Sequence, residues 1–419
     1  MARSKKRMAK IMGDKFKITK SQVVSSLNYL PSLPKKKKKP VRQTRIRTSD
    51  DPMRVAILCP YSMSIPGGVQ NQVLLLSKEM RNRGIDARII APCDGAPPVP
   101  YFQSVGTTKA LKSNGSLAPI ADDSGTASLT YDAVNNFRPD VIHLHEPLVP
   151  GPTVAAMIGL DYPLVATFHA AGEGMQTLKY LRHPARGATS RLHKRIAVSL
   201  EAKKRAIEFL PGEYEIIPNC VDIETISNAS KWPTTKPAVL FIGRHEERKG
   251  LRYLIQAWMS SKVLQENADL WVAGIGPETE ELIDISKAEK SITFLGRIDN
   301  DELYRRMRAS SVVVAPALHG ESFGIVLLEA MAANSCVVAT DIPGYRDVAR
   351  SGVEAVLVEP GDSQALKIAI EKILNDDKLR KSLQSAGITR SKEFSVAKVV
   401  DQYIEVYKQA IGQLASKTD

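Results

Sequence analysis

Strand-like and helix-like patterns alternate along this chain in two separate blocks. The first block covers about residues 54–219, and the second covers about residues 238–393. Such alternation predicts a parallel sheet covered by helices in each block. The stretch between the blocks contains Trp232-Pro233 and favours a linker. We therefore expect an α/β protein made of an N-terminal domain at 53–220, a hinge at 221–237 and a C-terminal domain at 238–395.

A further helical pattern follows the second domain, at residues 396–419. Its apolar side chains recur with the period of an α-helix, at Val399, Val400, Tyr403, Ile404 and Tyr407. We therefore expect one face of this last helix to pack against the rest of the protein.

Positive charge is concentrated in the first 52 residues. They hold 16 Lys or Arg and three Asp, a net charge of +13, and the whole 419-residue chain also carries +13. Residues 53–419 are therefore neutral overall, and we expect no nucleic-acid binding by the globular part. The tail, with its lysine run at 35–39, predicts a disordered segment. Binding to anionic lipid, binding to nucleic acid and a plain solvated extension all fit it, and a natural start at Met53 is a fourth interpretation.

The cysteines and the hydropathy pattern indicate a cytoplasmic protein. No C-x-x-C pair occurs among Cys59, Cys93, Cys220 and Cys336, so reduced thiols are the simplest interpretation. No run of about 18 apolar residues is present, and we expect no transmembrane segment.

Two histidines flank Leu144 at the end of a predicted strand. They are His143 and His145, and Glu146 follows them. Side chains alternate between the two faces of a strand. On this ground we expect the two imidazoles not to converge, and we expect no metal site there.

Two glutamates bracket a stretch of the second domain that is typical of a ligand site. An apolar run at 312–316 predicts a buried strand before it. Ser322 is a good N-cap for the helix that follows, and Gly324 leaves the first helical turn open to an anion. Glu321 comes just before this helix, and Glu329 comes eight residues later, about 12 Å along the axis. The pattern suits a ligand with an anionic middle and hydroxyl-bearing ends, whereas an ordinary solvated helix is the alternative.

A basic turn follows another predicted strand of the same domain. Residues 239–243 end in Gly243, and Arg244 and Lys249 come next, before a helical pattern at 251–258. In α/β sheets, ligands gather at the carboxyl ends of strands. The planar fork of Arg and the point charge of Lys both suit a diphosphate, and a solvated charge run is the alternative.

Paired glycines precede a helix of the first domain. A strand at 54–59 is followed by a turn with Tyr61, and Gly67-Gly68 then leads into a helix at 71–83. Glycines before a helix let the backbone approach a phosphate. No Gly-Lys-Ser/Thr follows, so this is not a Walker loop.

In this order, the three stretches resemble the retaining glycosyltransferases of family 4, and most of all the actinobacterial phosphatidylinositol mannosyltransferases. The resemblance spans nearly everything from Met53 to the C-terminus. It rests on the segments Cys59 to Ser62, Pro66 to Gln70, Val141 to Pro147, Ala166 to His169, Pro218 to Asp222, Gly243-Arg244, Arg248 to Gly250 and Glu321 to Ala333. It implies a GT-B fold, in which two Rossmann-like domains face each other across a cleft and the C-terminal helix crosses back onto the first domain.

The resemblance also implies roles for the matching residues. His169 would contact the transferred sugar, and Glu321 would contact the hydroxyls of the donor hexose. Arg244 and Lys249 would carry the diphosphate as catalytic residues. Glu329 would hold the ribose. The other substrate-binding residues would be Gly68, Tyr61, Gln70, Asn114, Ser116, Gly243, Gly324 and Ile325.

The reaction that the resemblance implies is transfer of mannose from GDP-mannose to phosphatidylinositol, with retention of configuration. The attack would come from the front face, and the leaving diphosphate would help to deprotonate the acceptor hydroxyl. No tightly bound cofactor is implied, and Mg²⁺ accompanying the nucleotide sugar is left open. The protein would be cytoplasmic and peripheral on the inner face of the cell membrane.

The acceptor region departs from the pattern of the mannosyltransferases. In those enzymes basic residues follow an Asn-Gly-Ser, whereas residues 117–123 here hold two Asp and no Lys or Arg. Acidic charge there repels an anionic head group. A polysaccharide or small-molecule acceptor and a UDP-linked donor therefore stay open. A non-catalytic binding protein that acts through its basic tail is a third interpretation, and the presence of both Glu321 and Glu329 argues against it.

Overall fold

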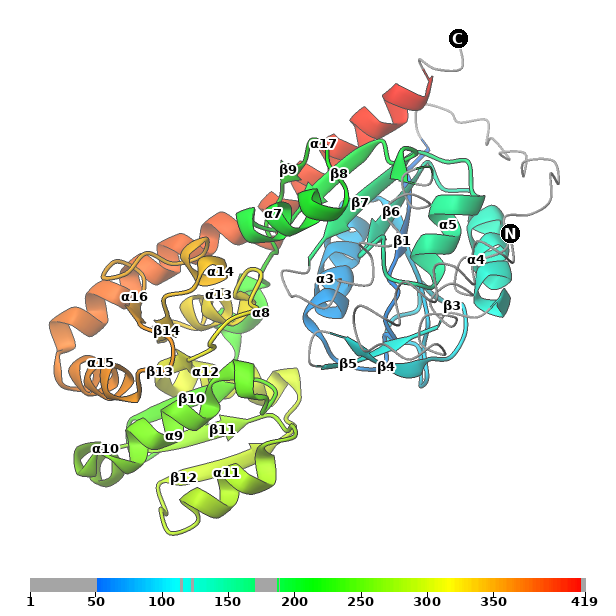
Figure 1. The fold of residues 1–419 in the computed structure, drawn as a ribbon. Helices are drawn as coiled ribbons and strands as arrows, with labels where there is room; N and C mark the ends of the chain where they lie inside the picture. The colour runs from blue at the N-terminus through cyan, green and yellow to red at the C-terminus, as the bar shows by residue number, and fades with distance from the viewer. Residues whose placement is uncertain (1–50, 114–115, 122–123, 170–186, 188, 416–419) are drawn as a thin grey trace.

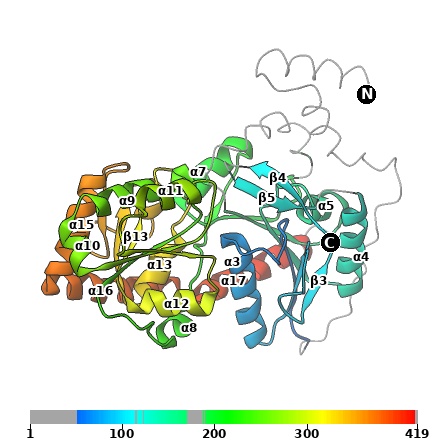
Figure 2. The same cartoon turned by 90° about the horizontal axis from the view of Figure 1, so that it is seen from below.

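The computed structural model describes residues 51–113, 116–121, 124–169, 187 and 189–415. The basic tail at 1–50 and the predicted site residue Asn114 lie outside the described residues. Two lobes stand side by side, and a long C-terminal helix runs from one to the other (Figures 1 and 2).

The first lobe is built on a parallel sheet, which has seven strands within the described residues. Its strands, in the spatial order β3-β2-β1-β6-β7-β8-β9, are β3 (Phe102–Ser104), β2 (Asp86–Ala91), β1 (Arg54–Leu58), β6 (Val141–His145), β7 (Leu164–Phe168), β8 (Lys194–Ala197) and β9 (Glu215–Ile216). Its helices include α3 (Gly68–Asn82), α4 (Ser124–Phe137), α5 (Pro152–Gly159) and α7 (Leu200–Phe209). The central strands are buried along their length, as expected of a sheet that is covered on both faces.

The antiparallel hairpin β4 (Lys109–Ser113) and β5 (Ser116–Ile120) belongs to the first lobe but lies outside its sheet. An isolated bridge joins Ile120 to Tyr61, which ties the hairpin to the turn after β1.

The second lobe is built on a parallel sheet of six strands, again counted in the described residues. Its strands, in the order β12-β11-β10-β13-β14-β15, are β12 (Ile292–Gly296), β11 (Asp269–Ala273), β10 (Ala238–Ile242), β13 (Ser310–Ala315), β14 (Cys336–Thr340) and β15 (Val356–Val358). Its helices include α9 (Leu251–Met259), α10 (Lys262–Asn267), α11 (Thr279–Ser286), α12 (Asn300–Ala309), α13 (Ile325–Ala332), α14 (Pro343–Arg346), α15 (Ser363–Asn375) and α16 (Asp377–Ser391). The predicted fold of two facing Rossmann-like sheets is confirmed.

The chain passes between the lobes twice, and the two passages are hydrogen-bonded to each other. Val221 precedes the short helix α8 (Ile223–Asn228) on the first passage, and Ser395 precedes α17 (Val396–Ala415) on the second. The Val221 amide donates to the Phe394 carbonyl at 3.0 Å, and the Val396 amide donates to the Val221 carbonyl at 3.2 Å. These bonds form a small parallel bridge between the lobes.

Helix α17 returns to the first lobe (Figure 1), where it is in contact with α3. Val399, Val400, Tyr403 and Tyr407 from the predicted stripe are fully or almost fully buried, in one core cluster with β1 and β2. Each such apolar side chain stabilises the docked helix by about 1.5–3 kcal/mol. The prediction of a helix that crosses back onto the first domain is therefore confirmed.

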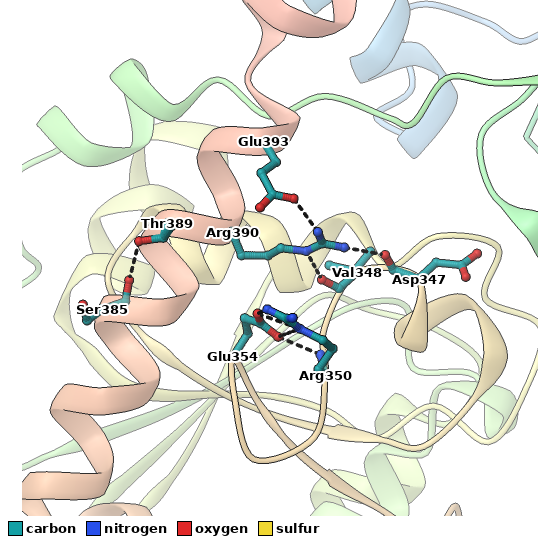
Figure 3. Close-up of polar contacts among 8 residues, drawn as sticks. All are labelled: Asp347, Val348, Arg350, Glu354, Ser385, Thr389, Arg390 and Glu393. Atoms are coloured by element: carbon teal, nitrogen blue, oxygen red, sulfur yellow. Dashed lines mark hydrogen bonds and ion pairs between the residues drawn. The ribbon is translucent and has the colours of Figure 1, made fainter.

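A second contact joins the lobes beside α16. Arg390 donates to the carbonyl oxygens of Val348 and Asp347, at 2.9 and 3.0 Å (Figure 3). The Asp347 carboxylate in turn accepts from the amide of Leu200, the first residue of α7, at 3.1 Å. An acidic side chain of the second lobe thus lies at the N-terminus of a helix of the first, where it is favoured by the helix dipole.

Candidate active site

A cleft of about 500 Å³ lies between the two lobes, and residues of both line it. The first lobe contributes the start of α3 together with Tyr61, Glu146, His169 and Asn219. The second lobe contributes Lys249 from the turn after β10, the stretch from Glu321 to Val326, and Glu329. The carboxyl ends of the central strands of both sheets face this cleft, as is usual for ligand sites in α/β proteins.

The turn after β10 is held in place by a close backbone approach. It forms one short 3₁₀ turn, Glu247–Lys249, that ends at Gly250 with φ +69°. A Cβ on Gly250 would lie 1.9 Å from the Pro316 carbonyl oxygen, so only glycine fits there. The Leu318 amide donates to the Arg248 carbonyl at 2.8 Å. The turn therefore packs directly against the loop after β13, and its basic residues Arg248 and Lys249 lie next to that loop.

Glu321 is shared by two cations at the centre of the second lobe's side of the cleft. Its Oε1 lies 2.8 Å from Lys249 Nζ and 2.8 Å from Arg248 Nη1. Burial by itself raises the pKa of this carboxyl, but Lys249 and Arg248 outweigh it and hold the pKa below its ordinary value. Glu321 is therefore ionised at neutral pH, and it stays a hydrogen-bond acceptor for a hydroxyl-bearing ligand.

Arg244 lies beside the cleft and not among the residues that line it. Its Nε is 2.9 Å from Glu246 Oε1, and the side chain is 46% exposed. Glu246 is buried and also pairs with Arg248 Nε at 3.2 Å. The predicted diphosphate contact thus depends on Arg244 turning from Glu246 towards the cleft. Gly243, also predicted as a binding residue, directly follows the end of β10 and does not line the cleft either.

Helix α13 begins at Ile325, and its N-cap is Gly324 in the left-handed conformation, with φ +76°. The prediction that Ser322 caps this helix was wrong. The chain needs a sharp turn directly before Ile325, and glycine adopts that conformation without the steric cost of a Cβ. Gly324 and Ile325 both line the cleft, so the start of α13, whose first N–H groups have no partner within the helix, lies at the cleft.

Glu329 lies one turn further along α13 and also lines the cleft. Burial raises the pKa of its carboxyl to about 7. No cation comparable to Lys249 is among the causes of this shift, so Glu329 differs from Glu321 although both are glutamates on one segment. Tyr304 on α12 lines the same end of the cleft, and burial raises the pKa of its phenol.

His169 follows β7 and is 7% exposed. Its backbone amide donates to Glu146 Oε1 at 2.9 Å, and its Nε2 lies 2.8 Å from His145 Nδ1. Burial lowers the pKa of this imidazole to about 4, so the ring is neutral at physiological pH. Glu146 itself has φ +50°, a conformation that non-glycine residues rarely adopt.

The prediction that His143 and His145 do not converge was wrong. Their ring centroids are 4.2 Å apart. Neighbouring residues of a strand point to opposite faces, but residues two apart point to the same face, and the two histidines are two apart. In the described part of the chain, no group of three or more His, Cys, Asp or Glu side chains is arranged to hold a metal ion.

The remaining predicted residues fall into three groups. Tyr61 and Gly68 line the cleft on the first lobe's side, and a Cβ on Gly68 would lie 3.9 Å from Ile325 Cδ1 of the other lobe. Gln70 instead braces the loop before α3, because its Nε2 donates to the Ile65 carbonyl at 3.2 Å. Ser116 begins β5, but its side chain is outside the described residues, as is Asn114.

Sequence reasoning left several cleft residues without a role. They are Gln72, Glu146, Asn219 and Tyr304. Arg248, which pairs with Glu321 but does not line the cleft, was also left without a role. Gln72 stands four residues after Gly68, on the same face of α3, which is a signal that was available. Its amide forms two 2.8 Å hydrogen bonds to the backbone of Cys220, 148 residues away, and no local pattern reveals such a pair.

None of the helices in the described part of the chain combines the length and the apolar character that a membrane crossing requires.

Residues 222–390 match the family model of the glycosyl transferases group 1, and residues 66–225 match that of Glycosyltransferase Family 4. A phosphatidyl-myo-inositol mannosyltransferase of Mycobacterium leprae is 35% identical over 361 residues, which cover 85% of this chain and 96% of that protein.

The protein of the same name from Mycobacterium tuberculosis is 35% identical over 371 residues, which cover 86% of this chain and 98% of the Mycobacterium tuberculosis protein. Two solved structures have the same fold at low identity. A sucrose-phosphate synthase from Thermosynechococcus elongatus has a TM-score of 0.68 at 18% identity, and it covers 86% of this chain and 100% of its own. A glycosyltransferase from Rickettsia africae has a TM-score of 0.67 at 19% identity. The match covers 86% of this chain and 99% of the Rickettsia africae protein. The chain therefore belongs to glycosyltransferase family 4 and has the GT-B fold.

Proposed function

We propose that this glycosyltransferase moves mannose from GDP-mannose to phosphatidylinositol, with retention of configuration. The observation that carries the proposal is the convergence of Lys249, Glu321 and the start of α13 on one cleft, opposite Gly68 and His169. Identity of 35% to two phosphatidyl-myo-inositol mannosyltransferases over most of both chains supports the choice of sugar and acceptor.

In the proposed complex the diphosphate lies at the N-terminus of α13, next to Lys249. Positive charge and free N–H groups there stabilise the negative charge that grows as the sugar–phosphate bond breaks. Glu321 accepts from hydroxyls of the hexose, and Glu329 accepts from the ribose. Closure of the lobes brings Gly68 and His169 to the donor and excludes water, which limits hydrolysis.

The acceptor is tested with radiolabelled GDP-mannose and vesicles. We expect labelled lipid with phosphatidylinositol vesicles and none with phosphatidylglycerol vesicles of the same charge. Glu321→Gln, which keeps the size of the side chain but removes its charge, should abolish transfer. Absence of labelled lipid with the unmodified chain would remove phosphatidylinositol as acceptor.

The acidic residues 122 and 123 favour testing a second candidate, a family 4 enzyme with another donor or acceptor. A thermal-shift series with GDP, UDP and their sugar conjugates separates the donors. Stabilisation by GDP-mannose alone supports the first proposal, and stabilisation by a UDP sugar alone supports the second.

We propose a cytoplasmic location, peripheral on the inner face of the membrane, with the basic tail as the lipid contact. Each basic residue near an anionic surface contributes about 1 kcal/mol. A chain that begins at Met53 should bind GDP-mannose as before but sediment less with anionic vesicles. Unchanged sedimentation would exclude the tail as the membrane contact.

A further inference from the structure

Three imidazoles lie together behind the cleft. His143 and His145, both on β6, are fully buried and do not line the cleft, whereas His169 does. The ring centroids of His145 and His169 are 5.1 Å apart, and the rings are stacked. The predicted roles concern His169 alone, so the other two rings have no assigned purpose.

Hydrogen bonds connect this cluster to the crossover helix α17. His143 Nε2 lies 2.7 Å from Thr167 Oγ1, and His143 Nδ1 lies 2.8 Å from the Tyr407 hydroxyl. Both nitrogens of His143 are therefore satisfied. His145 Nδ1 lies 2.8 Å from His169 Nε2, and His145 Nε2 is buried without a hydrogen-bond partner among the described residues.

All three rings are neutral at physiological pH. Burial lowers the pKa of His143 to about 3 and that of His169 to about 4, and it lowers the pKa of His145 well below its ordinary value. A neutral imidazole carries one N–H and one acceptor nitrogen. In the contact between His145 and His169, one ring donates and the other accepts.

The unpartnered nitrogen of His145 decides which ring donates. If Nε2 carried the proton, a buried N–H would have no acceptor, and buried N–H groups without an acceptor are rarer in proteins than buried acceptors without a donor. The proton therefore belongs on Nδ1 of His145, which donates to His169 Nε2. His169 must then carry its own proton on Nδ1. The Asn219 side chain also lies beside His169 and acts against the lowering of the pKa of its ring.

We propose that His145 is a positioning residue that fixes His169 as its neutral Nδ1–H tautomer. The cleft is thereby given a hydrogen-bond donor without a positive charge. For its ligand the inference rests on the proposed glycosyl transfer. There, the transferred sugar gains positive charge as its bond to phosphate breaks, so an uncharged donor holds a sugar oxygen without repelling the transition state.

The tautomer is measured directly by NMR of protein labelled with ¹⁵N-histidine, because the shifts of the two ring nitrogens differ between the tautomers. The chain has seven histidines, and loss of one set of signals in His169→Gln assigns that residue. We expect His169 to be protonated at Nδ1 in the ligand-free protein. A ring protonated at Nε2 overturns the proposal, whether or not mannose transfer is found.

His193 provides the matched control. Its Nδ1 accepts from the Leu164 amide at the start of β7, the opposite end of the strand from His169. His193→Gln should remove its own signals and leave those of His169 unchanged. A shift of the His169 signals in this variant would mean that the tautomer responds to general packing, and it would count against a specific role for His145.

Two substitutions of His145 separate positioning from packing. His145→Asn keeps an N–H near the place of Nδ1, whereas His145→Leu removes it. We expect His145→Leu to move His169 towards the Nε2–H tautomer and to lower kcat about tenfold or more, with a smaller change in the KM for donor. His145→Asn should recover most of the kcat and the original tautomer. An equal loss of kcat in both variants, with an unchanged His169 tautomer, would contradict the proposal. If His145→Leu does not fold, the tautomer of His169 in the unsubstituted protein tests the proposal alone.

Discussion

At the scale of single residues, charge in the cleft is set by neighbours and not by residue type. Glu321, between Lys249 and Arg248, has a lowered pKa, whereas Glu329, eight residues away, has a pKa of about 7. The two carboxylates therefore respond differently to pH. The difference in pKa depends on which side chains surround each glutamate in space. It cannot be predicted from the spacing of the two glutamates in the sequence.

Glu329 should make donor binding depend on pH. An ionised carboxylate accepts hydrogen bonds from ribose hydroxyls more strongly than the protonated acid does, so affinity for GDP-mannose should rise as the pH increases through about 7. Because its folded pKa is raised, the folded state keeps this proton where the unfolded state has lost it. Stability relative to Glu329→Gln should therefore fall between about pH 4.5 and pH 7 and stay level above. Calorimetry and thermal melting at a series of pH values test both, and parallel curves for the two proteins would contradict the assignment.

Arg244 should act on turnover more than on affinity. The guanidinium of Arg244 is paired with Glu246 at the side of the cleft. If it turns to the diphosphate as charge develops, Arg244→Ala should lower kcat by about 10²–10³ and change the KM for donor much less. Steady-state kinetics of this variant and of Arg244→Lys measure the split. A change in KM alone would show that the residue has no transition-state role.

At the scale of elements, the start of α13 places the anion site, and Gly324 fixes that start. A Cβ on Gly324 would lie 2.6 Å from Tyr345 Cδ1, in addition to the strain of φ +76°. Gly352 has φ +74° and nothing within 4 Å of such a Cβ. Both Gly→Ala substitutions should cost about 1–2 kcal/mol of stability from strain, and Gly324→Ala should cost about 1–3 kcal/mol more.

The paired variants also separate stability from binding. Gly324→Ala should weaken binding of GDP-mannose, because the Tyr345 clash displaces the first turn of α13, whereas Gly352→Ala should not. Thermal melting and calorimetry provide the two readouts. Equal effects of the two substitutions on affinity would mean that the start of α13 does not contact the diphosphate.

The elements themselves were largely predictable from the sequence. The strand expected at 312–316 is β13, Ser310–Ala315, and the helix expected at 251–258 is α9, Leu251–Met259. Buried strands of a parallel sheet are continuous apolar runs, so hydrophobic pattern finds them well. The start of α13 was misplaced because Ser322 has a strong capping preference that the tertiary contact at Gly324 overrides. The pairs that build the site, such as Gln72 with Cys220, join distant segments and have no local signature.

At the scale of the whole molecule, activity should depend on how closely the two lobes approach each other at Gly68. A side chain at this position meets Ile325 of the other lobe. Gly68→Ala adds only a Cβ at ordinary contact distance, whereas Gly68→Leu fills the space into which the lobes close. We expect a graded loss of kcat from Gly68 to Ala to Leu. Small-angle scattering with donor present should show a smaller compaction for Gly68→Leu, and equal compaction would contradict closure at this point.

The paired passages of the chain at Val221 and Ser395 determine how the cleft can open. A single linker permits rotation about any direction, but two crossings tied by backbone hydrogen bonds resist torsion and bend most easily about one axis. The lobes should consequently open and close by rotation about a single hinge axis. Residues that face each other across the closed cleft should therefore meet in the same register at every turnover.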